Sequence, residues 1–359
     1  ALWTHRFTPG WWLLLTSLVS VSLWLGFFTA RHIPYQHDLW WQFTFEGDAS
    51  RFLRAAVGAG CVFGIIALAQ ALRPGRPRHH TSVEPQTVER LVSLSSHAGA
   101  ALAFLGDKEF TLSTDGRSGL MHADQGRSRI VMGDPLGETD PSDDLLWRFV
   151  EQAQDEGMRP VFYQISVIEM PRLVDMGFKL FKLGEEATVA LERFTLDSPD
   201  ARRLRQTRSR FQRAGLTFAI WDTGTVAERL ETLRGISDAW LSDHKSGEKG
   251  FSLGRFDDDY MRRFPCAVVQ AAEGEVIAFT NLWSTANKLE LSVDLMRHLP
   301  GAPGGVMEAL FIEMILWGRE QGYRSFNLGM APLSGLSTHP LAPLWNKLAD
   351  RIFHRGESF

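Results

Sequence analysis

The sequence predicts an α+β fold preceded by two transmembrane helices. Two long apolar stretches come first, and amphipathic helical segments and short alternating strands then follow one another in two successive rounds. Of the 359 residues, 44% are apolar and 22% are charged, which is typical of a protein that is mostly globular. This length suits a small membrane part followed by two domains of about 100–150 residues.

The two apolar stretches predict a transmembrane hairpin within residues 1–80. Residues 11–30 are uncharged and long enough to cross a bilayer, and no small-residue cleavage site of a signal peptide follows them. The second stretch, 55–72, contains glycines that would allow close helix packing. The basic flank at 73–80 predicts that both ends of the hairpin face the cytoplasm. Two buried helices of a soluble protein are the alternative interpretation.

Charge and cysteine content exclude several classes of protein. A net charge of −4 is not that of a dedicated nucleic-acid binder, so a nucleic-acid partner would need a local basic patch. The two cysteines cannot build a disulfide framework or a cysteine-rich zinc site, which suits a reducing compartment. We expect no metal site and no cofactor.

The remaining chain predicts two domains of mixed structure, at 81–197 and 215–359, joined by a basic linker helix at 198–214. In the first domain we expect helices beginning near 88 and at 143–156 and 173–176, and strands at 102–105, 109–112, 129–132, 160–165 and 185–191. In the second we expect strands at 216–221 and 289–296, a hairpin of 266–271 with 275–283, helices at 225–241 and 306–321, and a strand at 325–329.

The strand at 289–296 is the strongest candidate for a functional site. Its leucines and valine alternate with Glu290, Ser292 and Asp294, so these polar side chains share one face. This face is either a solvated surface or the floor of a cleft with an acidic group. A glycine- and proline-rich loop at 297–305 leads from it into a helix, and a helix N-terminus is a ready site for anions.

Other polar segments leave alternatives open. Glu308, in the first turn of the following helix, is either a ligand or a surface residue that complements the helix dipole. Asn327 could present its amide to the same cleft. The loop that contains Arg255 is either an exposed connection or a substrate clamp. Six arginines lie within 202–213, and Arg202, Arg205 and Arg208 among them either form a solvated face or contact phosphates of tRNA or lipid headgroups.

Several segments together resemble one family. The order of elements in the second domain resembles the GNAT acyltransferase fold, and the first domain has a similar rhythm. The segments 248–256, 290–297, 305–307, 326–335, 341–346 and 354–357 resemble the C-terminal catalytic region of the multiple peptide resistance factor family, the lysyl- and alanyl-phosphatidylglycerol synthases. The resemblance covers roughly residues 85–359 and implies a tandem GNAT pair whose second copy holds the active site.

The resemblance also implies a reaction and its partners. Aminoacyl-tRNA would donate an amino acid, with lysine favoured, to phosphatidylglycerol in the bacterial inner membrane, giving resistance to cationic antimicrobial peptides. The family has an N-terminal flippase region and continues beyond the position of Phe359, so we expect further active-site residues there. A homo-oligomer is also compatible with the resemblance.

The resemblance gives the polar residues candidate roles. Asp294 would be the general base or would hold the donor's ammonium, and Arg297 would hold lipid phosphate or the developing oxyanion. Positions three apart on a regular strand face opposite ways, so this pair needs a bulge near Met296. Glu357 is a further catalytic candidate. Arg255, Glu290, Ser292, Asn327 and Glu308 are substrate-binding candidates.

Two rival functions stay open at this point. One is another GNAT-like transferase that uses acyl-CoA, or that moves amino acids from tRNA to cell-wall peptide. The other is a membrane receptor without enzymatic activity. Binding of CoA would favour the first, and an unchanged lipid composition after expression would favour the second.

Overall fold

The computed structural model describes residues 20, 59–60, 62–64, 83–138, 143–244, 247–248 and 250–336. The two predicted membrane spans lie almost wholly outside these residues. Within the described part, no helix combines the length and apolar character needed to cross a bilayer. The chain divides into one compact unit of Ala1–His79, Asp124–Arg129 and Val150–Pro160, and a second of His80–Ala123, Ile130–Phe149 and Val161–Phe359.

In the first unit, the described residues centre on a buried arginine. Arg129 is 1% exposed and pairs with Asp124 at 2.8 Å and Glu156 at 2.9 Å. Both carboxylates raise the pKa of Arg129 against the opposing effect of its burial. The helix α5 (Asp143–Asp155) ends nearby at Gly157, whose φ of 70° closes the helix as the sequence predicts.

The first sheet has the strand order β1-β2-β3-β5, with β4 paired to β2. Its strands are β1 (Glu109–Leu112), β2 (Ser118–Gln125), β3 (Ser128–Met132), β4 (Leu136–Gly137) and β5 (Arg159–Tyr163). Its helices, besides α5, are α4 (Pro85–Leu94), the 3-10 helix η1 (Ala98–Leu105) and α6 (Met170–Asp175). The strand expected at 102–105 is wrong, because η1 occupies this position. A short, fully apolar run has no periodicity that separates a strand from a buried helix.

The second sheet has the order β6-β11-β10-β9-β8-β7. Its strands are β6 (Gly184–Ala190), β7 (Thr217–Trp221), β8 (Cys266–Gln270), β9 (Val276–Ser284), β10 (Glu290–His298) and β11 (Ser325–Pro332). Neighbouring strands are antiparallel except for β10 and β11, which run parallel. The predicted hairpin of β8 and β9 is confirmed, and Gly274 in its turn has a φ of 83°.

One strand belongs to a different sheet from the one expected. The sequence predicts 185–191 as the last strand of the first domain, but β6 pairs antiparallel with β11 at the edge of the second sheet, where Val189 lies opposite Phe326. Local pattern predicts a strand but not its neighbour, because pairing depends on contacts distant in sequence. The second sheet is thus completed by a segment that precedes its other strands.

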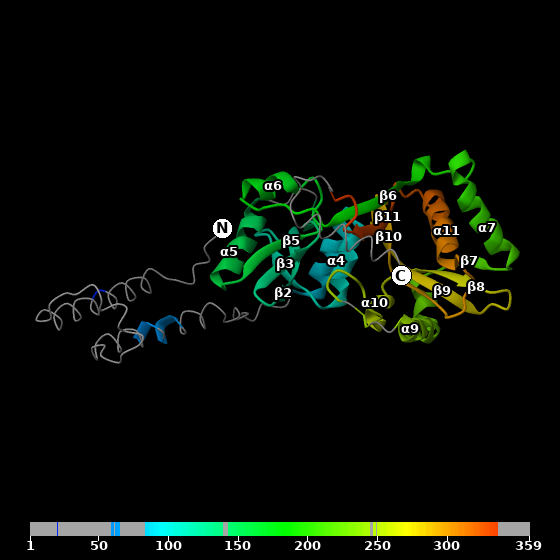
Figure 1. Cartoon of the computed structure of the whole chain (residues 1–359), viewed down its shortest axis with the longest axis horizontal. Coiled ribbons are helices and arrows are strands. Elements are labelled where there is room, and N and C mark those ends of the chain that lie inside the picture. The colour runs from blue at the N-terminus through cyan, green and yellow to red at the C-terminus, as the bar shows by residue number, and fades with distance from the viewer. Residues whose placement is uncertain are drawn as a thin grey trace, which may run out of the picture. The chain divides into compact units, whose positions relative to one another are not determined.

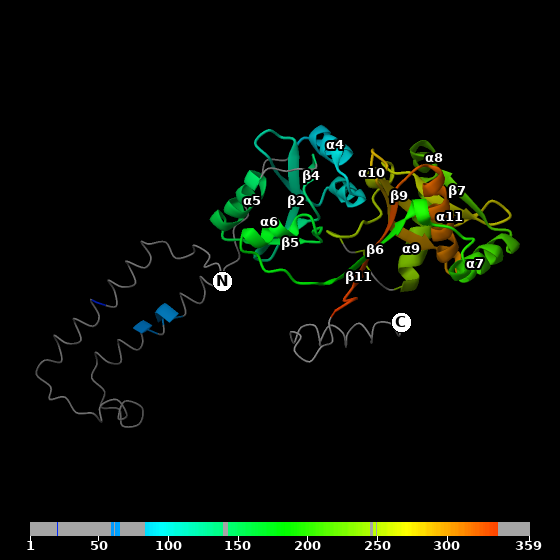
Figure 2. The same cartoon turned by 90° about the horizontal axis from the view of Figure 1, so that it is seen from above.

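Helices cover both faces of the second sheet. On one face, α7 (Arg202–Arg213) and α11 (Val306–Glu320) lie side by side, as Figures 1 and 2 show, and bury Phe211 and Leu310. The other face is covered by α8 (Thr223–Glu228) and α9 (Leu230–His244). The core on this face also takes in Leu102 of η1. Two 3-10 helices, η2 (Leu191–Arg193) and η3 (Pro199–Ala201), lie between β6 and α7, and the short helix α10 (Asp258–Met261) lies between α9 and β8.

Candidate functional site

A β-bulge in β10 shapes the candidate site. The parallel strands β10 and β11 pair over Glu290–Ser292 and Ser325–Asn327. Immediately beyond this pairing, the register of β10 with β9 shifts between Val293 and Met296. Three steps along β10 there face two steps along β9, which is the geometry of one inserted residue. This bulge is the irregularity that cooperation between Asp294 and Arg297 requires.

Asp294 is held by two hydrogen-bond donors. The backbone N–H of Gly254 donates to Oδ1 at 2.8 Å, and the hydroxyl of Tyr260 donates to Oδ2 at 2.7 Å. That hydroxyl accepts in turn from the indole N–H of Trp283 at 2.9 Å. Burial raises the pKa of Asp294, and the Tyr260 and Gly254 donors lower it in part. Burial and the charge of Asp294 keep the pKa of Tyr260 well above its usual value, so Tyr260 stays a donor.

Arg297 is packed against an aromatic ring. Its guanidinium carbon lies 4.2 Å from the ring centroid of Trp240, and an Nη atom lies 3.4 Å from Glu248. Its side chain is 11% exposed, and burial lowers the pKa of Arg297. Among the residues that the structure describes, no hydrogen-bond partner meets its buried Nε. Arg297 therefore keeps donor capacity for an anionic group.

The structure brings Glu290 and Asn327 into direct contact. The Asn327 amide donates to Glu290 at 2.6 Å and to Glu186 of β6 at 2.8 Å. Burial raises the pKa of Glu290, the Asn327 bond lowers it, and the charge of Glu186 raises it further. Two carboxylates that share one amide form an acidic cluster that a cation would stabilise.

Two other candidates have partners within the fold. The hydroxyl of Ser292 donates to the backbone carbonyl of Asn327 at 3.0 Å, so it joins β10 to β11. Glu308, in the first turn of α11, lies 3.7 Å from Arg203 of α7, and both side chains are mostly exposed. Pairs of this kind contribute little to stability. Glu357 lies outside the described residues.

The loop that leads from α9 to α10 is anchored rather than free. Gly254 donates its N–H to Asp294, and the N–H of Phe256 donates to Glu248 at 2.9 Å. Arg255 donates to the carbonyl of the residue that ends η1, at 3.1 Å. These contacts hold the loop against the rest of the fold, and its role as a substrate clamp stays a prediction.

The arginines of α7 divide into two groups. Arg205 donates to backbone carbonyls of the segment before the helix, and Arg208 pairs with Glu313 of α11 at 2.6 Å. These two side chains hold the helix in place. Arg202, Arg203, Arg210 and Arg213 are exposed and present charge outward, and Arg203 among them lies near Glu308.

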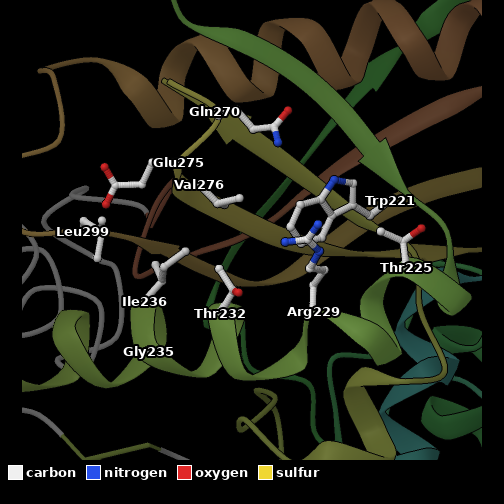
Figure 3. Close-up of a pocket in the computed structure, with 11 residues that line it drawn as sticks. Trp221, Thr225, Arg229, Thr232, Gly235, Ile236, Gln270, Glu275, Val276 and Leu299 are labelled. Atoms are coloured by element: carbon white, nitrogen blue, oxygen red, sulfur yellow. The ribbon is translucent and has the colours of Figure 1, made fainter. Parts of the chain in front are cut away.

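A separate cavity of about 490 Å³ lies on the α9 face of the second sheet. Thr225 of α8, Thr232 of α9 and Arg229 between these helices line it, opposite side chains of the sheet such as Trp221 and Gln270 (Figure 3). None of the residues predicted for the site lines this cavity. No motif in the sequence indicates it, because its lining comes from segments far apart in the chain.

Comparison with known proteins identifies the family. The family model described as phosphatidylglycerol lysyltransferase, C-terminal, matches residues 89–359. The chain belongs to this family. The phosphatidylglycerol lysyltransferase of Bacillus subtilis is 42% identical over 254 residues, which cover 70% of this chain and 29% of that protein. The Staphylococcus aureus (strain MSSA476) protein of the same name is 36% identical over 252 residues, covering 70% and 30%.

Solved structures agree with membership of the phosphatidylglycerol lysyltransferase family. The structure of L-PGS from Bacillus licheniformis superimposes with a TM-score of 0.70 at 38% identity, covering 77% of this chain and 84% of that one. The family predicted from the sequence motifs is therefore confirmed. The chain spans about 30% of the length of the curated relatives that it matches.

Proposed function

We propose that this chain transfers lysine from lysyl-tRNA to phosphatidylglycerol. The names of its relatives support this reaction, because those proteins are called phosphatidylglycerol lysyltransferases, which specifies lysine as the transferred amino acid. The observation on which the proposal rests is the placement of Asp294 and Arg297 at the bulge in β10, where a partly buried carboxylate and a partly unpaired guanidinium lie three residues apart on one strand.

The reaction exchanges one ester for another. A glycerol hydroxyl of phosphatidylglycerol attacks the carbonyl carbon of the aminoacyl ester, and the new C–O bond forms as the bond to the tRNA ribose oxygen breaks. Asp294 takes the hydroxyl proton and returns it to the ribose oxygen. A carboxylate has about four lone-pair sites, so those left by Gly254 and Tyr260 can accept this hydroxyl. A general base in this position typically raises the reaction rate by roughly 10²–10⁴-fold.

Arg297 would stabilise negative charge during transfer. Its guanidinium is held in orientation by the Trp240 ring and Glu248, so little ordering is needed when an anion binds. The anion is either the lipid phosphate or the oxyanion that develops on the attacked carbonyl. In both cases removal of the charge lowers transfer.

The acidic cluster of Glu290, Glu186 and Asn327 would receive the positively charged aminoacyl group. Lysine esterified to tRNA carries two ammonium groups. The two carboxylates already share one amide, and the charge of Glu186 helps to raise the pKa of Glu290 beside the effect of burial. An ammonium between them would relieve this repulsion, which favours lysine over a neutral side chain.

The surrounding architecture is part of the same proposal. We take residues 1–80 as a transmembrane hairpin and cytoplasmic flank and 81–359 as two GNAT-like domains. The second domain includes the strand β6 and the basic helix α7. The whole protein would lie in the cytoplasmic membrane with these domains on the cytoplasmic side, next to an N-terminal flippase region. The exposed arginines of α7 would contact tRNA or anionic lipid.

An in vitro transfer assay tests the proposed reaction. The full-length protein is incubated in detergent with phosphatidylglycerol and tRNA charged with either radiolabelled lysine or radiolabelled alanine. We expect label in the lipid fraction from the lysyl donor. Label from the alanyl donor alone would reassign the amino acid, and no label from either donor would refute the proposal.

A further inference from the structure

A buried ion pair of Asp107 and Lys108 lies directly before β1. The side chain of Lys108 has no exposed surface, and its ammonium donates to Asp107 at 2.7 Å. Burial lowers the pKa of Lys108, and the charge of Asp107 opposes this. A buried charge is costly unless it is paired, so this buried ion pair calls for an explanation.

The second carboxylate oxygen of Asp107 reaches a segment far along the chain. Oδ2 accepts the backbone N–H of Phe251 at 3.1 Å. The ammonium of Lys108 lies 5.9 Å from the centroid of the Phe251 ring. The ring centroid of Tyr163 in β5 lies 6.4 Å from the same centroid. The ion pair therefore holds both the backbone and the ring of Phe251.

Phe251 has a backbone conformation that is unusual for its residue type. Its φ of 69° lies in the left-handed region, which phenylalanine rarely adopts and which needs surrounding contacts to persist. Three residues later, Gly254 donates to Asp294 of β10. The segment 250–256, which we call the anchored loop, is thus held at Phe251 by the first sheet's ion pair and at Gly254 by the second sheet's carboxylate.

We propose that Asp107 and Lys108 are positioning residues for the transfer reaction, acting through the anchored loop on Asp294. They fix Phe251 in its left-handed conformation, and this sets where the N–H of Gly254 meets the carboxylate. This inference rests on the proposed function. Small displacements of reacting groups cost large factors in rate, so a loosened loop lowers the rate of the chemical step rather than the binding of either substrate.

The alternative is that the pair only ties its sheet to the rest of the second unit, and a matched control separates the two. Arg263 and Glu89 form another ion pair of 2.7 Å, which joins α4 to the segment after α10 without touching the anchored loop. We compare the full-length double variant Asp107→Asn/Lys108→Met with the double variant Glu89→Gln/Arg263→Met. Phe251→Gly is a third variant, because glycine adopts this φ freely but lacks the ring.

Steady-state transfer from lysyl-tRNA and hydrogen exchange of peptides covering 248–256 are measured for each protein. We expect the Asp107/Lys108 variant and Phe251→Gly to lose about tenfold or more in kcat with KM for lysyl-tRNA unchanged, and to exchange faster in the loop. The Glu89/Arg263 variant should match wild type in both. Equal losses in the two double variants, or wild-type kcat with a loosened loop, would overturn the inference. An inactive wild-type protein would instead refute the proposed function, whereas loop exchange can be read without activity.

Discussion

Gly254 and Asp294 are packed so closely that no side chain fits at position 254. A Cβ built on Gly254 would overlap the carboxylate of Asp294, whose Oδ1 accepts the N–H of the same glycine at 2.8 Å. The glycine is therefore required for space. This contact fixes the anchored loop against β10 at the candidate site.

Replacement of Gly254 by alanine tests this contact. We expect Gly254→Ala to displace the Asp294 carboxylate and lower transfer at least tenfold, because the added methyl group meets a buried charged group. The cost in stability should be about 1–3 kcal/mol. Transfer rates and thermal unfolding are measured beside Gly247→Ala, since a Cβ at Gly247 meets nothing within 4 Å. Equal rates in both variants would show that the packing at Gly254 is not needed for transfer.

The Tyr260 hydroxyl should control the pH dependence of transfer. Transfer needs ionised Asp294, so activity falls as the pH drops through the pKa of Asp294, which burial raises above its usual value of 3.8. Tyr260→Phe removes a donor that lowers this pKa, so the acid limb of the pH–rate profile should move to higher pH. An unmoved acid limb would mean that Asp294 is not the titrating group.

The same carboxyl group should affect stability with a definite sign. Because the folded state raises the pKa of Asp294, the folded protein binds the proton more tightly than the unfolded chain does. The free energy of unfolding therefore falls as the pH rises from about 4 through the raised pKa. Asp294→Asn should remove the contribution of Asp294 to this decrease in the free energy of unfolding. Urea unfolding of the wild-type protein and of the variant across this pH range measures the difference.

Glu290 should decide how well a lysyl donor is recognised. Glutamine is similar in size to glutamate and can still accept from the Asn327 amide, so Glu290→Gln removes only one negative charge of the acidic cluster. We expect KM for lysyl-tRNA to rise by about tenfold, with KM for phosphatidylglycerol unchanged, because a charged hydrogen bond is lost. Glu192→Gln, an exposed glutamate in η2, serves as the control. An equal rise in both variants would point to a general charge effect.

The exposed arginines of α7 should contribute to substrate binding through charge. The triple variant Arg202→Ala/Arg210→Ala/Arg213→Ala should weaken engagement of tRNA or anionic vesicles and flatten its dependence on salt. Arg208→Ala should instead lower stability by roughly 1 kcal/mol, since its partly exposed pair with Glu313 lies between two helices. Binding titrations from low to high salt distinguish these effects, and an unchanged salt slope would leave α7 as a solvated face.

The sequence predicts much of the second sheet because its signals are local. Alternation along 289–296 identifies β10 and the polar face of Asp294, and the apolar periodicity of 306–321 identifies α11. The glycine at 274 marks the hairpin turn. In each case one short segment predicts its own secondary structure, through the periodicity of its apolar side chains or through a turn residue.

The partners of the candidate residues could not be predicted in the same way. Tyr260 donates to Asp294 across 34 residues of sequence, and Trp283 donates to Tyr260 across 23 residues. Neither residue stands in a motif. Arg205 and Arg208 look like the other arginines of α7 until Glu313 and the preceding carbonyls are placed beside them. Such contacts depend on tertiary packing, which local pattern does not encode.

Mass spectrometry of lipids measures aminoacyl transfer to phosphatidylglycerol by this protein in cells. Lipids are extracted from cells that express the full-length protein, its Asp294→Asn variant or neither. We expect lysyl-phosphatidylglycerol in cells with the wild-type protein and at least a tenfold decrease with the variant at equal protein level. Phosphatidylglycerol without any aminoacyl adduct in the wild-type cells, or equal adduct levels in both, would contradict it.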